Sequence, residues 1–161
     1  MHQPVEIPVT LSVLDRLIDY EPGASIEVSL SRAQSLKLLR AAVRRDLEWV
    51  LNSRRIAFEP DAEFEELNRS GYVMGVMDFT AFSLANSSEQ SRLLRHIQSV
   101  VQQFEPRLAN VRITQKDDHL KTRSLRFRIE ASLLIDPSPV RISFDTLLHL
   151  SSGEYSVQEE S

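Results

Sequence analysis

The residues that could do chemistry in this sequence are acids and histidines, and no recognised motif joins them. Glu48, Asp78 and Glu105 stand beside apolar residues, where a pair of acids would suit glycoside hydrolysis. With 23 acidic residues in 161, however, chance pairs of acids are inevitable. The chain also lacks a nucleophile elbow, a phosphate-binding glycine loop and the zinc motif His-Glu-x-x-His. We therefore predict a protein that is not an enzyme and binds no small-molecule substrate or cofactor.

Metal chemistry has no support in the pattern of possible ligands. There is no cysteine, which excludes disulfides and thiolate sites. The histidines are scattered, and none has a partner at the spacing of a metal site; they are His2, His96, His119 and His149. We predict that no metal is bound and that His96 and His149 lie at the surface or its rim.

Composition predicts one soluble domain. A chain of 161 residues with 42% apolar residues can bury a core without covalent staples. The net charge of −4 argues against nucleic-acid binding, and no apolar run is long enough to insert in a membrane. The start of the chain lacks a signal-peptide pattern, so we expect a cytoplasmic protein. We predict a tail over residues 1–10, a single domain over 11–157 and a frayed end over 158–161.

Apolar residues at helical spacing predict two main helices and a short N-terminal helix at residues 13–18. The long helix follows a capping box formed by Ser31 and Gln34 and extends through residues 36–55. A second capping box, Ser87 with Gln90, predicts another helix, which Pro106 ends. The core stripe expected on the long helix comprises Leu36, Leu39, Val43, Leu47, Val50 and Leu51.

The long helix also carries apolar residues on its opposite side, at Leu38, Ala42 and Trp49. Either the N-terminal helix covers this second patch, or the patch contacts another protein. Arg44 and Glu48, one turn apart, are expected to form an exposed ion pair.

The region between the two main helices predicts irregular structure. Residues 59–71 are acidic and should form a loop, with one helical turn at 62–67. Residues 71–78 predict a buried loop or a short strand that packs on the long helix. Residues 25–30 alternate like a short strand or an extended connection.

From Leu108 onward the apolar residues recur at every second position, which predicts strands. A turn over residues 136–139 should place Ile135 opposite Val140 and Leu133 opposite Ile142, so that both apolar rows share one face. A further turn leads to a short strand at residues 155–157. The predicted fold class is α+β: an antiparallel sheet of three to four strands packed on the helices.

Two surfaces are candidates for binding. The outer face of the sheet mixes basic and acidic residues, and it is either a solvated face or next to an edge that pairs with a partner strand. At the helix-to-strand corner stand Glu105, Pro106 and Arg107. They form either a plain helix stop or a rigid recognition point whose arginine binds carboxylates or carbonyls.

Four segments, in order, resemble the TssE family of type VI secretion baseplate components, part of the phage baseplate wedge family historically labelled "lysozyme-like". Residues 12–17 resemble S-L-L-D-R-L, and residues 45–48 with 51–55 resemble R-D-L-E…L-N-T-R-R. Residues 70–78 resemble S-x-x-x-Y-G-L-P-D, and residues 104–108 match F-E-P-R-L. Ser53 replaces the usual threonine, and the proline usual before Asp78 is missing.

The resemblance implies a structural subunit without lytic activity, at a baseplate docked on the inner membrane. Its expected partners are the wedge proteins TssF and TssG, sheath subunits and other baseplate proteins. Glu105, Pro106 and Arg107 are expected to grip the core helices of the wedge, and the sheet to continue into sheath strands. The alternatives are a peptidoglycan hydrolase, or a regulatory anti-adaptor on the same fold.

Overall fold

A computed structural model describes residues 7–18, 23, 30–58, 60–79, 86–116 and 124–159. The chain forms two compact units, residues 1–43 and 44–161, and helix α2 (Arg32–Asn52) runs from the first into the second. The possible strand at 25–30 lies outside the described residues, except for Leu30. His2, His119 and most of the loop expected at 115–122 also lie outside them.

The first unit contains the short helix α1 (Val13–Leu17), as the sequence predicts. The predicted capping box of α2 is confirmed, because Ser31 N–H donates to Gln34 Oε1 at 2.9 Å and Gln34 N–H donates to Ser31 Oγ at 3.3 Å. The apolar side chains of α1 are exposed, and so is Leu38 on α2, whereas Ala42 is buried. Helix α1 therefore does not bury its apolar residues by covering the second patch of α2.

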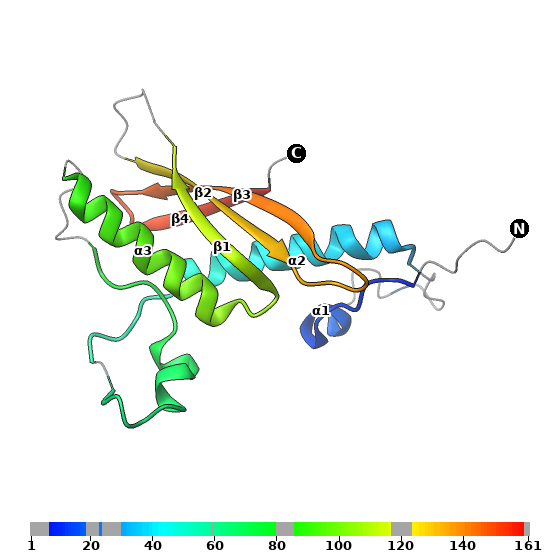
Figure 1. Ribbon diagram of the computed structural model, residues 1–161, viewed down its shortest axis with the longest axis horizontal. Coiled ribbons are helices and arrows are strands. Elements are labelled where there is room, and N and C mark those ends of the chain that lie inside the picture. The colour runs from blue at the N-terminus through cyan, green and yellow to red at the C-terminus, as the bar shows by residue number, and fades with distance from the viewer. Residues whose placement is uncertain are drawn as a thin grey trace, which may run out of the picture. The chain divides into compact units, whose positions relative to one another are not determined.

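The second unit is built on one antiparallel sheet (Figure 1). Its strands β1 (Leu108–Gln115), β2 (Ser124–Leu133), β3 (Val140–His149) and β4 (Glu154–Glu159) lie side by side in chain order. Helix α3 (Ser87–Phe104) packs against β1. The predicted α+β class is confirmed, and the sheet has four strands.

One face of the sheet carries the core. Alternate residues of β2 and β3 are buried, while the residues between them are half-buried or exposed, as the two-residue period predicts. In the long helix every residue of the predicted stripe is buried except Leu36, which is half-buried. The largest fully buried side chains of the second unit include Leu47, Leu51, Leu93, Ile97, Phe127, Ile129, Leu133, Phe144 and Leu148.

The register of the β2–β3 hairpin differs from the predicted one by two residues. Leu133 pairs with Val140 and Ala131 with Ile142, so Ile135 belongs to the connection and not to the ladder. The connection therefore spans residues 134–139 and is longer than the predicted turn. Because side chains alternate with a period of two, a slip of two residues leaves the same residues facing the core.

Helix α3 starts with a different cap from the predicted one. Asn86 is the N-cap residue, and its side-chain oxygen accepts from Ser88 N–H at 3.0 Å. Asparagine caps a helix as well as serine does, and Asn86 precedes the predicted cap, Ser87, by one position. The predicted end of the helix is correct, since α3 stops at Phe104 and Glu105 leaves helical geometry.

The segment between α2 and α3 folds back onto the end of α2. Ser53 C=O accepts from Val76 N–H at 2.9 Å, and Val76 C=O accepts from Arg55 N–H at 3.1 Å. This parallel bridge agrees with the predicted buried loop or short strand at 71–78. The helical turn expected at 62–67 lies later, in the 3-10 turns Leu67–Arg69 and Gly71–Val73.

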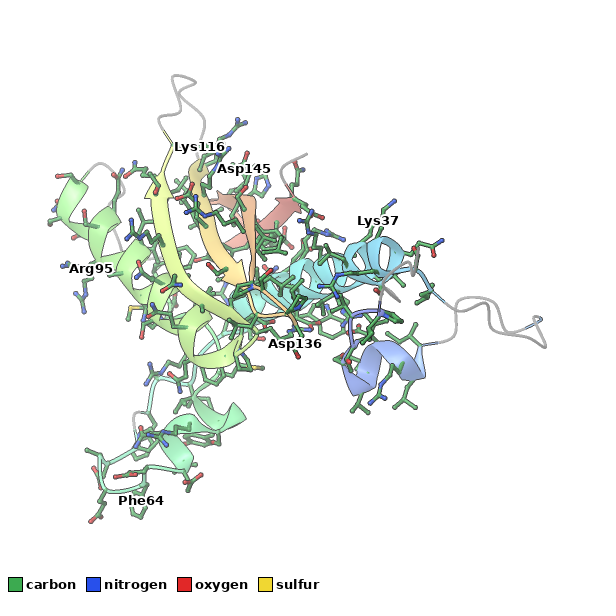
Figure 2. All side chains as sticks on the ribbon, turned by 45° about the vertical axis from the view of Figure 1, so that its right-hand side comes forward. Lys37, Phe64, Arg95, Lys116, Asp136 and Asp145 are labelled. Carbon is green, nitrogen blue, oxygen red and sulfur yellow. The ribbon has the colours of Figure 1, made fainter. Side chains whose placement is uncertain are left out.

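The outer face of the sheet is charged. Asp145 on β3 binds Arg128 Nε at 3.0 Å and Lys116 Nζ at 2.8 Å. Figure 2 labels Lys116 and Asp145 on the sheet. The hydrogen bond from Arg128, followed by the one from Lys116, lowers the pKa of Asp145 below its ordinary range. Because Asp145 is 41% exposed, solvent screens this pair and it adds little stability. Among the described residues, no helix is long and apolar enough to cross a membrane.

Replacing Gly75 should destabilise the fold more than replacing any other described glycine. Its φ is +112°, and an added Cβ would meet Ser53 O at 2.3 Å inside the bridge. We expect Gly75→Ala to lower the free energy of unfolding by about 2–3 kcal/mol, measured by urea denaturation. Gly71→Ala is the matched control, because no atom lies within 4 Å of its added Cβ. Equal losses for the two variants would contradict the strained backbone at Gly75.

Candidate functional site

The predicted recognition corner is a tight connection between α3 and β1. Glu105 N–H still donates to Val101 O at 2.9 Å, and Glu105 O accepts from Leu108 N–H at 3.1 Å. Pro106 lacks an N–H and therefore ends the helical hydrogen bonds. Arg107 O accepts from Leu134 N–H at 2.8 Å, which ties the corner to the connection after β2. Backbone hydrogen bonds alone thus connect the corner to α3, β1 and the segment after β2.

Arg107 folds back and binds two carboxylates. Its Nε donates to Glu105 Oε1 at 2.7 Å, and its Nη2 binds Glu105 Oε2. The same Nη2 donates to Asp46 Oδ2 on α2 at 2.6 Å. Glu105 is thus held by a bidentate pair, the strongest geometry that arginine offers a carboxylate. One guanidinium joins the corner to a helix that is 61 residues away in the sequence.

A second arginine completes the cluster. Asp46 Oδ1 accepts from Arg45 Nε at 2.9 Å and from Arg45 Nη2 at 2.8 Å. The Arg45 guanidinium also lies over the ring of Trp49, 5.1 Å from its centroid. This distance is within the range of a cation–π contact, although Trp49 is 57% exposed. Two arginines therefore balance two carboxylates.

Burial differs sharply within the corner. The Glu105 side chain is 4% exposed and that of Arg107 is 24% exposed, whereas Pro106 is exposed. The hydrogen bond to Glu105, and then the one to Asp46, raises the pKa of Arg107 above its ordinary value despite burial. Arg107 is therefore a permanent cation that compensates the buried Glu105 charge.

The structure brings together Glu105 and Arg107, two of the three residues predicted for the site, and leaves Pro106 at the surface. That these residues bind a partner stays a prediction. Sequence reasoning did not include Asp46 and Arg45 in the site, although both lie in the R-D-L-E segment. The segment was a usable signal, but no local pattern shows that it meets a corner 61 residues away.

The three candidate acids have different partners. Glu48 pairs with Arg44 at 3.6 Å, as predicted, and Asp78 pairs with Arg54 at 3.7 Å. Glu105 is held by Arg107. Each of the three acids is therefore engaged by a different arginine.

The two histidines that the structure describes lie at the surface or its rim, as the sequence predicts. His96 Nε2 accepts from Met77 N–H at 3.1 Å, and His149 is exposed at the end of β3. Within the described ranges no three acid or histidine side chains gather as metal ligands would.

Side chains of α2 form hydrogen bonds with backbone groups of the edge strand β4. Asn52 Oδ1 accepts from Tyr155 N–H at 2.9 Å, and Asn52 Nδ2 donates to Tyr155 O at 2.9 Å. Arg44 Nη1 donates to Val157 O at 3.3 Å. Asn52 thus takes the place of a neighbouring strand at Tyr155. These bonds protect part of an edge that would otherwise pair with another chain.

A comparison with family models matches residues 37–138 to "baseplate wedge protein gp25". The match covers most of α2, all of α3, β1 and β2, and most of the connection that follows β2. This chain belongs to the baseplate wedge protein gp25 family. No curated protein and no solved structure matches it. The family is a structural component of phage-tail-like baseplates, and its members act with other baseplate proteins.

Replacing Arg107 should cost stability, because Glu105 would remain buried without its counter-charge. We expect Arg107→Gln to lower the free energy of unfolding by about 3 kcal/mol in a denaturant titration. Arg128→Gln is the matched control, since its side chain is also 24% exposed but its partner Asp145 is 41% exposed. The control should lose at most about 1 kcal/mol. Similar losses in both variants would show that Arg107 does not compensate a buried charge.

Removing the Asn52 amide should open the β4 edge. Asn52→Ala leaves Tyr155 N–H and C=O without their partners, so hydrogen exchange at the Tyr155 amide should accelerate about tenfold or more. The exposed Gln158→Ala on the same strand is the control and should leave that rate unchanged. If Tyr155 exchanged at the same rate in Asn52→Ala, the edge would not depend on this side chain.

Proposed function

We propose that this protein is a structural subunit of a type VI secretion baseplate, with the role of TssE. It would link the wedge core, made of TssF and TssG, to the contractile sheath without catalysis. It would work in the bacterial cytoplasm, at a baseplate docked on the inner membrane. The family supports a baseplate role, and the TssE-like segments support this particular machine.

The Asp46–Arg107–Glu105 cluster is the observation that carries the proposal. Two of the four segments that resemble TssE, one on α2 and one at the corner, meet there through a single guanidinium. This shared guanidinium holds the corner in one position relative to α2. With the charges occupied, exposed Pro106 is the part of the corner presented to a partner.

The sheet supplies the proposed connection to the sheath, through pairing of an edge strand with a sheath strand. At β4 such a strand would have to displace Asn52 and Arg44 from Tyr155 and Val157. The edge to be tested first is therefore β1, the other outer strand of the sheet.

A peptidoglycan hydrolase is the less favoured reading. Glu105 and Asp46 are two acids brought to one place, but both accept hydrogen bonds from Arg107. The Arg107 guanidinium thus lies between the two carboxylates, where a hydrolase would hold the glycosidic bond between its two acids. Clearing of a cell-wall suspension that is lost in Glu48→Gln or Glu105→Gln would overturn the structural role.

The corner is best tested at Pro106, because changes at Arg107 also disturb the fold. We expect Pro106→Asp to reduce co-purification with TssF and TssG at least tenfold, since it places a charge on the proposed contact. Pro139→Asp, at an exposed proline of the β2–β3 connection, should bind as the parent chain does. Thermal melts should show both variants folded. Undiminished binding by folded Pro106→Asp would show that the corner does not contact the wedge.

The machine itself is tested by co-purification from the native host at natural expression level. Recovery of TssF, TssG and sheath protein supports the proposal. Recovery of a regulatory factor without baseplate proteins would support the anti-adaptor alternative and contradict it.

A further inference from the structure

Between α2 and α3, residues 60–74 form a loop that hydrogen bonds close. We call residues 56–58 and 60–74 the acidic loop. Asn68 Nδ2 closes it by donating to Asp61 O at 2.9 Å and to Phe64 O at 3.0 Å. Gln103 Nε2 on α3 donates to Asn68 O at 2.7 Å and fastens the loop to the helix. These bonds from side-chain amides to backbone carbonyls therefore close the loop and attach it to α3.

This loop exposes its large apolar side chains. Phe58 is 65% exposed and Phe64 is 50% exposed, and Figure 2 shows Phe64 at the outer tip of the loop. The exposed apolar residues of the loop are Ile56, Phe58, Phe64, Leu67, Tyr72 and Met74. Single exposed apolar residues are common, but six within one short segment make this loop a candidate for a contact with a partner.

The same loop is strongly negative. Its described carboxylates are all exposed, and none forms an ion pair with a described residue; they are Asp61, Glu63, Glu65 and Glu66. Arg69 is the only basic residue in residues 56–74. Phe64 thus stands between Glu63 and Glu65, two negative charges that form no ion pair with a described residue.

We propose that the acidic loop docks a basic amphipathic helix of a partner protein. Such a helix offers an apolar stripe to Phe64 and lysines or arginines to Glu63 and Glu65 on either side of it. This inference does not depend on the corner or on the type VI assignment.

Charge selects this occupant over the others. An anionic membrane surface or a nucleic acid would be repelled by the four carboxylates. A second copy of this chain carries a net charge of −4, which repels the acidic loop at long range. A purely apolar partner would leave the carboxylates desolvated and unpaired, which costs free energy.

The proposal is tested with a synthetic 18-residue helical peptide that has a leucine stripe between arginines. Fluorescence anisotropy should show saturable binding to the full-length protein. Phe64→Ser should weaken binding about tenfold or more, because it removes a large ring from the contact. The Glu63→Gln, Glu65→Gln double variant should weaken it about threefold or more in dilute salt, and this effect should shrink as salt screens the charges.

The chain offers matched controls for both changes. Leu134→Ser removes an apolar side chain that, like Phe64, is 50% exposed, and Glu130→Gln with Glu154→Gln removes two exposed charges outside the loop. Both controls should bind the peptide as the parent does. Loss that follows the charges alone, equal loss in the controls, or no binding would each overturn the proposal.

A photocrosslinking residue at position 64, introduced in the native host, identifies the natural occupant. Crosslinked peptides that are basic and amphipathic support the proposal. Crosslinks to a second copy of this chain, or to a segment without basic residues, would overturn it.

Discussion

One guanidinium, that of Arg107, links the corner between α3 and β1 to helix α2. Arg107 binds Glu105 beside it and Asp46 on α2, so it sets the direction in which the chain leaves α3 and enters β1. Its own carbonyl accepts from Leu134 N–H, which fixes the end of β2 at the same place. Glu105 is tolerated in the interior because its charge is compensated and its oxygens are hydrogen-bonded.

The last turns of α2 fasten the sheet at two places. Asp46 binds the corner next to β1, while Arg44 and Asn52 bind backbone groups of β4 at the opposite edge. Polar side chains of α2 thus attach the helix to the margins of the sheet by hydrogen bonds, while Leu47 and Leu51 are buried in the core. For a subunit that must present fixed surfaces to neighbours, this arrangement keeps both margins of the sheet in place.

The sequence was most informative where local periodicity decides the outcome. Helices, strands and the core face followed from spacings of 3.6 and 2, and the end of α3 followed from the missing N–H of Pro106. It failed where near-equal local choices compete. Asn86 and Ser87 are both good caps, and the chain takes the first. The β2–β3 register was wrong by two residues, because a longer connection preserves every inward residue.

The sequence by itself determined the fold class, the apolar face of each element and the charged residues of the corner, because these depend on neighbours within a few positions. Only the tertiary structure decided what those charges do. Arg107 turns inward to Asp46, Asn52 closes the β4 edge at Tyr155, and the acidic loop keeps Phe64 outside. Each of these outcomes depends on groups brought together from distant parts of the chain, and a local pattern contains no information about which distant group will arrive.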